Sequence, residues 1–308
     1  MHLAIATAVN VVLSNDDGWA EINIREFYSS LTKAGFNVVL SAPAENESGT
    51  GSSDATPTTV GGGGCEFRSC PAGSPPYGKN ASMPRFNVSR PPMKHMDQAD
   101  QSQYVNSYPV TSMRYGIQNL SQTYFGGPPD IAVAGPNVGA NLGLTTQVSG
   151  TVGAATEAVK EGIPGLAFSG TTGTQTAWNT APQIYEEVYA DLSTTVTQAL
   201  VNSGKPYLPS NIWLNVNYPA VSSTSCSSTS SFEFVLSRIN SAVPLLTPKD
   251  VVTCNNGGRL PTETTVVGTA GCYASISVGI ATTKLDASAA NQQIVLTKLK
   301  SILSCLPS

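Results

Sequence analysis

Two kinds of hydrophobic spacing alternate along the first two thirds of the chain. Four short runs are almost wholly apolar, at residues 11–14, 36–40, 129–135 and 166–168. Such runs are typical of strands buried on both faces of a parallel sheet. Between them, apolar residues recur every three or four positions, most clearly at 24–34 and 184–200, and predict amphipathic helices. The first run, the helix and the second run form a βαβ unit, which predicts an α/β fold.

This alternation is interrupted at residues 52–110 and is lost after about residue 220. The first stretch is rich in glycine and proline, and we expect an extended insertion with little regular structure. Residues 211–219 predict one more strand, and the tail contains two strand-like runs, at 232–239 and 273–280, before a helix at 289–303. We therefore expect a core over 9–220 and a C-terminal extension over 221–308, as part of the same domain or as an oligomer arm.

Composition narrows the classes of partner. The chain has 308 residues, of which 12% are charged, and its net charge is −4. This charge provides no basic surface for a nucleic-acid backbone. No apolar run has the length needed to cross a membrane. We expect neither a nucleic-acid polymer nor a membrane as a partner.

The cysteines indicate an oxidising compartment. They are six, scattered through loop-like sequence: Cys65, Cys70, Cys226, Cys254, Cys272 and Cys305. They form no Cys-x-x-Cys pair and only two histidines are present, so a structural zinc site is not expected. An even number of cysteines predicts disulfides, with reduced thiols as the alternative. We predict a pair that closes a small loop in the insertion, Cys65–Cys70, and, from proximity along the chain alone, Cys226–Cys254 and Cys272–Cys305.

Four glycosylation sequons agree with a secreted glycoprotein. They begin at four asparagines: Asn46, Asn80, Asn87 and Asn119. Residues 1–8 are too short for a full signal peptide, and residues 3–8 have the composition expected of the end of one. We therefore expect an extracellular protein whose signal peptide is absent or truncated in this sequence.

The candidate chemistry begins where the first apolar run ends, in Asn-Asp-Asp-Gly at 15–18. Open α/β sheets bind ligands at the carboxyl ends of their strands. Neighbouring Asp16 and Asp17 can both face one ion only where the strand gives way to a loop, and Gly18 permits a sharp exit from the strand. The alternative is an Asx turn that caps the following helix.

Other loops at the same edge of the predicted sheet add oxygen ligands. Ser48 follows the second strand, and Asn137 and Asn141 follow the strand at 129–135. Together with the two aspartates they form an oxygen-only set suited to Mg²⁺ or Mn²⁺, with Ca²⁺ as an alternative. The alternative for residues 135–143 is a flexible loop that uses Gly and Asn for left-handed turns.

A helix start follows this loop and is a candidate anion site. Ser149, Gly150 and Thr151 open a segment of helix-favouring composition. The free backbone N–H groups and the positive end of the helix dipole would bind a phosphate. The alternative is an ordinary N-cap without a ligand. A divalent cation beside such a helix start suggests phosphate chemistry.

Taken together, these segments resemble the SurE (survival protein E) family of metal-dependent phosphatases and nucleotidases. The matching segments are Ser-Asn-Asp-Asp-Gly at 14–18, Ala-Pro at 42–43 with Ser-Gly at 48–49, Pro-Asp-Ile-Ala-Val-Ala-Gly-Pro-Asn-Val-Gly-Ala-Asn-Leu-Gly at 129–143, Ser-Gly-Thr-Val-Gly-Ala-Ala-Thr-Glu at 149–157 and Leu-Asn-Val-Asn-Tyr-Pro at 214–219. Their order and approximate spacing fit across residues 9–219.

The resemblance implies a Rossmann-like three-layer core with a mostly parallel sheet, and a β-rich and helical C-terminal extension used to form oligomers, a homodimer among them. It also implies metal-dependent hydrolysis of small phosphomonoesters, including nucleoside monophosphates. By position, the metal ligands are matched by Asp16, Asp17, Ser48 and Asn137, and the two aspartates are the catalytic candidates. The residues of the phosphate site are matched by Asn141, Ser149, Gly150 and Thr151.

Two departures resemble the secreted fungal branch of that family, whose members are described as acid phosphatases. The sequence after Gly18 lacks the Ala-Pro-Gly common in bacterial members, and the insertion at 52–110 is longer. A rival activity is a metal-independent acid phosphatase with a histidine nucleophile, but neither His2 nor His95 lies in an Arg-His-Gly sequence. A second rival is a secreted, non-catalytic glycoprotein that binds nucleotides or a partner.

Overall fold

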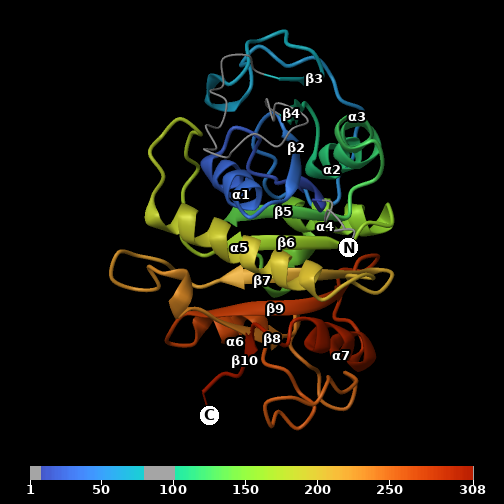
Figure 1. The fold of residues 1–308 in the computed structure, drawn as a ribbon, viewed down its shortest axis with the longest axis vertical. Helices are drawn as coiled ribbons and strands as arrows, with labels where there is room; N and C mark the ends of the chain where they lie inside the picture. Colours follow the sequence, from blue (N-terminus) through green and yellow to red (C-terminus); the bar gives the residue numbers. More distant parts are fainter. Residues whose placement is uncertain (1–7, 80–100, 308) are drawn as a thin grey trace, which may run out of the picture.

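The computed structural model describes residues 8–79 and 101–307. In this part of the chain, ten strands form one mixed sheet in the order β10-β8-β9-β7-β6-β5-β1-β2-β4-β3. Figure 1 shows the N-terminal half at one end of the molecule and the C-terminal extension at the other. One continuous sheet therefore contains strands from both parts of the chain.

Five parallel strands form the centre of this sheet, and all five lie within the expected core. They are β1 (Asn10–Ser14), β2 (Asn37–Pro43), β5 (Ile131–Val138), β6 (Gly165–Gly170) and β7 (Ile212–Tyr218). Because they run the same way, their carboxyl ends meet at one edge of the sheet. The loops after β1, β2 and β5 contain Asp16, Asp17, Ser48 and Asn141, whereas Asn137, which was expected to follow the strand, lies within β5 itself.

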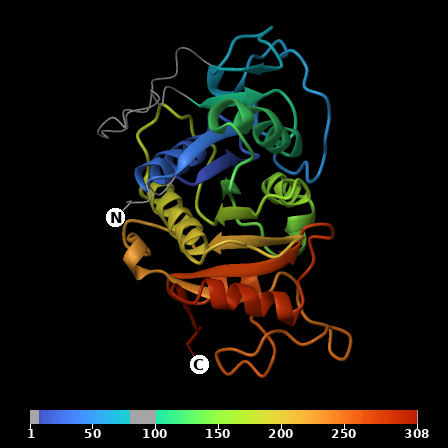
Figure 2. The same cartoon turned by 45° about the vertical axis from the view of Figure 1, so that its right-hand side comes forward.

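Helices cover both faces of the sheet, so the predicted three-layer α/β fold is confirmed. On one face α1 (Ile22–Lys33) packs against α5 (Ile184–Asn202), and on the other α2 (Pro109–Tyr115) packs against α4 (Gly150–Lys160). Side chains of β1 alternate between the two layers: Val11 lies in the apolar cluster of Phe27, whereas Val12 lies in that of Ala155. Figure 2 shows α5 and α4 on opposite sides of the strands.

The insertion contains more regular structure than its sequence predicts. Within it, β4 (Ser102–Val105) pairs in parallel with β2 and extends the sheet, and β3 (Tyr77–Gly78) pairs with β4. The short helix η1 (Glu66–Arg68) precedes both strands in the chain and contacts the loop after β1, where the Ala20 N–H donates to Glu66 Oε1 at 3.2 Å. After α2 the chain continues through η2 (Gly116–Leu120) and α3 (Ser121–Phe125). The expectation of little regular structure was therefore wrong for β4, which is too short and too polar to be recognised by spacing alone.

The C-terminal extension continues the same sheet. Strand β9 (Tyr273–Ile280) pairs antiparallel with β7, and β8 (Glu233–Ser237) and β10 (Leu303–Ser304) follow in parallel with β9. The helices of this part are α6 (Glu263–Gly268), α7 (Ala289–Lys298) and the short η4 (Thr229–Ser231) before β8. In the core, a further short helix, η3 (Gly143–Gln147), precedes α4. The antiparallel pairing of β9 with β7 brings α6 next to the central strands.

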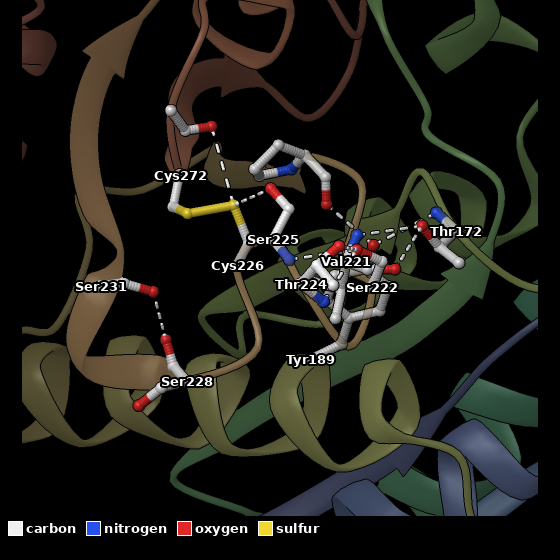
Figure 3. The surroundings of a disulfide bond; sticks show 12 residues. Thr172, Tyr189, Val221, Ser222, Thr224, Ser225, Cys226, Ser228, Ser231 and Cys272 are labelled. Carbon is white, nitrogen blue, oxygen red and sulfur yellow. Dashed lines mark hydrogen bonds between the residues drawn. A yellow bond between two sulfur atoms is a disulfide. The ribbon is translucent and has the colours of Figure 1, made fainter.

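All three disulfides are formed, and two of the predicted pairings were wrong. Cys65–Cys70 is confirmed, but the others are Cys226–Cys272 and Cys254–Cys305. Figure 3 shows the bond of Cys226 next to the loop that leaves β7. Cys272 directly precedes β9 and Cys305 directly follows β10, so strand pairing across the sheet, rather than distance along the chain, sets the partners.

Two of the four sequons lie on the described surface. Asn46 and Asn119 are both exposed, whereas Asn80 and Asn87 lie outside the described residues, as do His2 and His95. Among the described helices, none is long and apolar enough to cross a membrane.

Candidate functional site

In the loop after β1, one side chain forms the predicted turn and two others are the candidate metal ligands. Asn15 makes the Asx turn, since its Nδ2 donates to the Gly18 carbonyl at 2.9 Å and its Oδ1 accepts from the Gly18 N–H at 3.2 Å. Gly18 has a φ of 108°, which favours glycine. Asp16 and Asp17 are the central residues of this turn, and their buried side chains take no part in its hydrogen bonds. Turn and candidate site therefore occur together, on different side chains.

Asp16 lies against the start of α4. The Thr151 hydroxyl donates to Asp16 Oδ1 at 2.5 Å. Burial raises the Asp16 pKa, and the hydrogen bonds from Thr151 and from the backbone N–H groups of Thr151 and Gly150 oppose that shift. A Cβ atom on Gly150 would lie 2.7 Å from Asp16 Cβ, which is closer than real contacts allow. The candidate metal loop and the candidate phosphate turn thus share Asp16 and form one site.

Asp17 is held by two donors from other elements. Its Oδ2 accepts from the N–H of Val138 at 2.8 Å, and its Oδ1 accepts from Gln175 Nε2 at 2.5 Å. Next to Val138, Asn137 donates its Nδ2 to the Gly139 carbonyl at 2.6 Å, and its Oδ1 lies 3.3 Å from the Thr151 hydroxyl. The side-chain amide oxygen of Asn137 therefore faces the same Thr151 hydroxyl that contacts Asp16.

The site carries negative charge that the protein compensates poorly. Burial raises the pKa of Asp16, and burial together with the charge of Asp16 raises the pKa of Asp17 well above its ordinary value. Nearby, burial raises the pKa of Glu21, and that of Glu66 to about 8 despite the opposing charge of Arg25. A bound divalent cation would stabilise the charged form of these buried carboxylates.

The oxygen set present fits a hard divalent cation. Asp16, Asp17 and Asn137 supply carboxylate and amide oxygens at one strand edge, which is the donor chemistry of Mg²⁺ and Mn²⁺. Across the described ranges, no three His, Cys, Asp or Glu side chains come together as a group that could hold a metal ion. The candidate set contains only two such side chains and relies on neutral oxygens for the rest.

Ser48 is near this set without touching it. The N–H of Glu47 donates to the Asp16 carbonyl at 2.7 Å, so the loop after β2 contacts the loop after β1. The Ser48 side chain is exposed, and its backbone N–H is held by Asn46 at 2.8 Å. The structure thus brings the loop of Ser48 to the site and leaves its hydroxyl facing solvent.

Ser149 has the geometry of an N-cap. Its Oγ accepts from the Val152 N–H at 3.1 Å, and its backbone is extended, as at the start of other helices. The hydroxyl proton is not used in this contact, so Ser149 can still donate to an anion in front of the helix. Capping and phosphate binding are compatible at this position.

Asn141 lies farther along the same edge, above β6 and β7. Its Nδ2 donates to the Ser169 hydroxyl at 2.9 Å, and its N–H donates to Asn217 Oδ1 at 2.8 Å. The Asn141 carbonyl accepts from Nδ2 of both Asn215 and Asn217, at 2.9 and 3.1 Å. The peptide group of Asn141 is therefore fixed on both sides.

Several of these partners had no assigned role from sequence. Asn215 and Asn217 lie two residues apart in an otherwise apolar buried strand, so both point to one face, and this spacing is a detectable signal. Gln175 lies in an exposed loop after β6 and has no such signal. Its contact with Asp17 depends on the path of the 171–183 loop, which is held to α1 by the bond from the Ile22 N–H to the Thr176 carbonyl.

Comparison with known proteins agrees with this fold. Residues 11–240 match the family described as Survival protein SurE. An acid phosphatase from Yarrowia lipolytica is 32% identical over 296 residues, which cover 87% of this chain and 78% of that protein. A 5'-nucleotidase SurE from Lawsonia intracellularis is 29% identical and covers 70% of this chain and 67% of its own length.

A solved structure shares the fold. The SurE protein from Aquifex aeolicus matches with a TM-score of 0.56 and 21% sequence identity, over 88% of this chain and 93% of that chain. Since the family match extends over most of the chain and includes every candidate site residue, the protein belongs to the SurE family.

Proposed function

We propose that the protein hydrolyses small phosphomonoesters, nucleoside monophosphates among them, with the help of a divalent cation. The observation that carries this proposal is the contact between Asp16 and Thr151, which joins a pair of buried carboxylates to the N-terminus of α4. The names of the relatives, acid phosphatase and 5'-nucleotidase, support the same class of reaction.

In this proposal Asp16, Asp17 and Asn137 hold the cation, with Ser48 as a fourth ligand from the neighbouring loop. A bound Mg²⁺ or Mn²⁺ would polarise a phosphoryl oxygen or lower the pKa of a water molecule. The protein's own contribution is to fix both carboxylates in place, and the cation would stabilise their charged form. Val138 and Gln175 fix Asp17 through the two hydrogen bonds that restrain its orientation.

The phosphate-binding role falls to the turn that starts α4 and to Asn141. The N-terminus of an eleven-residue helix attracts an anion through its N–H groups and dipole. Gly150 has no side chain, which lets Asp16 pack directly against the start of this helix. Asn141, fixed by β6 and β7, would donate an amide hydrogen to a phosphoryl oxygen and orient the ester.

Chelation tests the proposal directly. We expect hydrolysis of p-nitrophenyl phosphate and of AMP to stop after exhaustive treatment with EDTA and to return when Mg²⁺ or Mn²⁺ is added. Independently of turnover, the same ions should raise the melting temperature of the EDTA-treated protein, because they bind the folded state. Hydrolysis that survives chelation would exclude the cation from the reaction. A protein that binds AMP without hydrolysing it would be a non-catalytic relative.

We also propose that the protein is secreted, and that its extension forms a homodimer. Three disulfides and exposed sequons at Asn46 and Asn119 support secretion. Assay of the culture medium of cells that express the protein, with mass loss after deglycosylation, tests the first statement. Light scattering of the purified protein tests the second.

A further inference from the structure

Asn141 is held by an amide clamp on β7. The two asparagines of the clamp, Asn215 and Asn217, lie on the same face of this strand because side chains alternate. Between them they accept from the Asn141 N–H once and donate to its carbonyl twice. The position of Asn141 therefore depends on how these two side chains are themselves held.

Glu263, from the C-terminal extension, binds one of the two asparagines of this clamp, Asn215. It is the first residue of α6 and its side chain is 0% exposed. Its Oε1 accepts from Asn215 Nδ2 at 2.7 Å, and its Oε2 accepts from the Gly143 N–H at 3.1 Å. A single carboxyl group thus connects β7 with the turn two residues beyond Asn141.

This arrangement is costly for stability alone. Burying a carboxyl group is unfavourable unless it is fully bonded, and an apolar side chain of similar volume would fill the space more favourably. The two oxygens of Glu263 accept from Asn215 and from the Gly143 N–H, which both adjoin Asn141, and Ser277 also bonds to this side chain. The Glu263 carboxyl group therefore restrains the loop of Asn141 and Gly143, which an apolar side chain could not do.

We propose that Glu263 is a positioning residue for Asn141, so that the extension over residues 221–308 completes the phosphate-binding side of the active site. This inference rests on the proposed function, in which Asn141 binds the substrate phosphate. It assigns to the extension a role in substrate binding, transmitted through Asn215 and the Gly143 N–H. The site of a phosphomonoester is then built from two parts of the chain that are more than 100 residues apart.

The test is a double-mutant cycle read by phosphate inhibition. Glu263→Gln, Asn215→Ala and the double variant are assayed for KM, kcat and the inhibition constant of inorganic phosphate, together with melting temperature. Gln292→Ala is the matched control, because Gln292 is a buried polar residue whose hydrogen bonds all stay within the extension. Each single site-linked variant should raise KM and the inhibition constant about tenfold, the effect of losing one hydrogen bond to a charged ligand.

The KM and the phosphate inhibition constant of the double variant should be at most about twice those of either single variant, because both substitutions act through one loop. Gln292→Ala should lower the melting temperature and leave the inhibition constant unchanged. If Glu263→Gln lowers only the melting temperature, or if the two single effects multiply in the double variant, the positioning role is refuted. A parent protein that neither hydrolyses a phosphomonoester nor binds phosphate would overturn the proposed function first, and this inference with it.

Discussion

Gly150→Ala tests whether Asp16 and the start of α4 form one site. An added Cβ would lie 2.7 Å from Asp16 Cβ, 2.9 Å from Pro109 Cγ and 3.0 Å from Asp16 Oδ2. The nearest atom is attached directly to the backbone of a buried loop, so it cannot swing aside as the end of a long side chain could. To reach ordinary contact, the loop and the helix must separate by about 0.5–1 Å.

This displacement predicts a large loss of activity with a smaller loss of stability. A misplacement of about 1 Å at reacting groups lowers the rate about 100-fold, so kcat/KM should fall by that factor. Overpacking destabilises by about 1–3 kcal/mol, and the better helix propensity of Ala offsets about 1 kcal/mol of this. We therefore expect a net loss of at most about 2 kcal/mol in the free energy of unfolding.

Gly268→Ala provides the matched control, since Gly268 is also helical and has no heavy atom within reach of an added Cβ. Kinetics on p-nitrophenyl phosphate and thermal melts of both variants measure the two effects. A Gly150→Ala protein that keeps the parent kcat/KM at an unchanged melting temperature would show that the described contact with Asp16 does not exist in solution.

Three further outcomes follow from the contacts. Asp17→Asn should bind no divalent cation and hydrolyse no ester while keeping its fold, and calorimetry with Mn²⁺ that shows unchanged affinity would contradict this. Ser149→Ala should lose about 1 kcal/mol of stability through the cap and, if Ser149 also binds phosphate, raise the phosphate inhibition constant; a change in melting temperature alone would make it a cap only. Burial raises the pKa of Glu263 to about 8 from 4.5, so its contribution is fully present below about pH 4.5 and is lost as the pH rises through about 8. The stability of the parent relative to Glu263→Gln should therefore decline by up to about 5 kcal/mol across that window, and a difference that is flat with pH would refute the buried, neutral carboxyl.

The central fold could be predicted because its signals are local and repeated. Apolar runs such as residues 11–14 and the helical spacing at 24–34 are long enough to show strand or helix on their own. The candidate site at Asp16 and Asp17 can also be recognised from the sequence, because two carboxylates directly after a buried strand are unusual unless they bind a ligand or form a turn. Strand β4 was missed because its place in the sheet depends on pairing with β2, which four partly polar residues do not reveal.

The parts that could not be predicted depend on contacts between distant segments. The partner of Cys226 is set by β9 lying next to β7, and nothing near Cys226 in the sequence indicates that pairing. The role of Glu263 is of the same kind, because a glutamate at the start of a short helix normally serves that helix through its dipole. Only the three-dimensional arrangement shows that its oxygens bond to Asn215 and Gly143 instead.

The turn at 149–151 shows why a motif does not determine the roles of its members. Ser149 is engaged with the Val152 N–H, Gly150 provides the space that Asp16 occupies, and Thr151 donates its hydroxyl to the Asp16 carboxylate. The helix N-terminus thus already stabilises one negative charge, that of the protein itself. A phosphate that binds there must share the N–H groups with Asp16, and two anions at one helix end repel each other. A divalent cation held by these carboxylates would reduce that repulsion, which is a physical reason to expect metal and phosphate to bind this site together rather than independently.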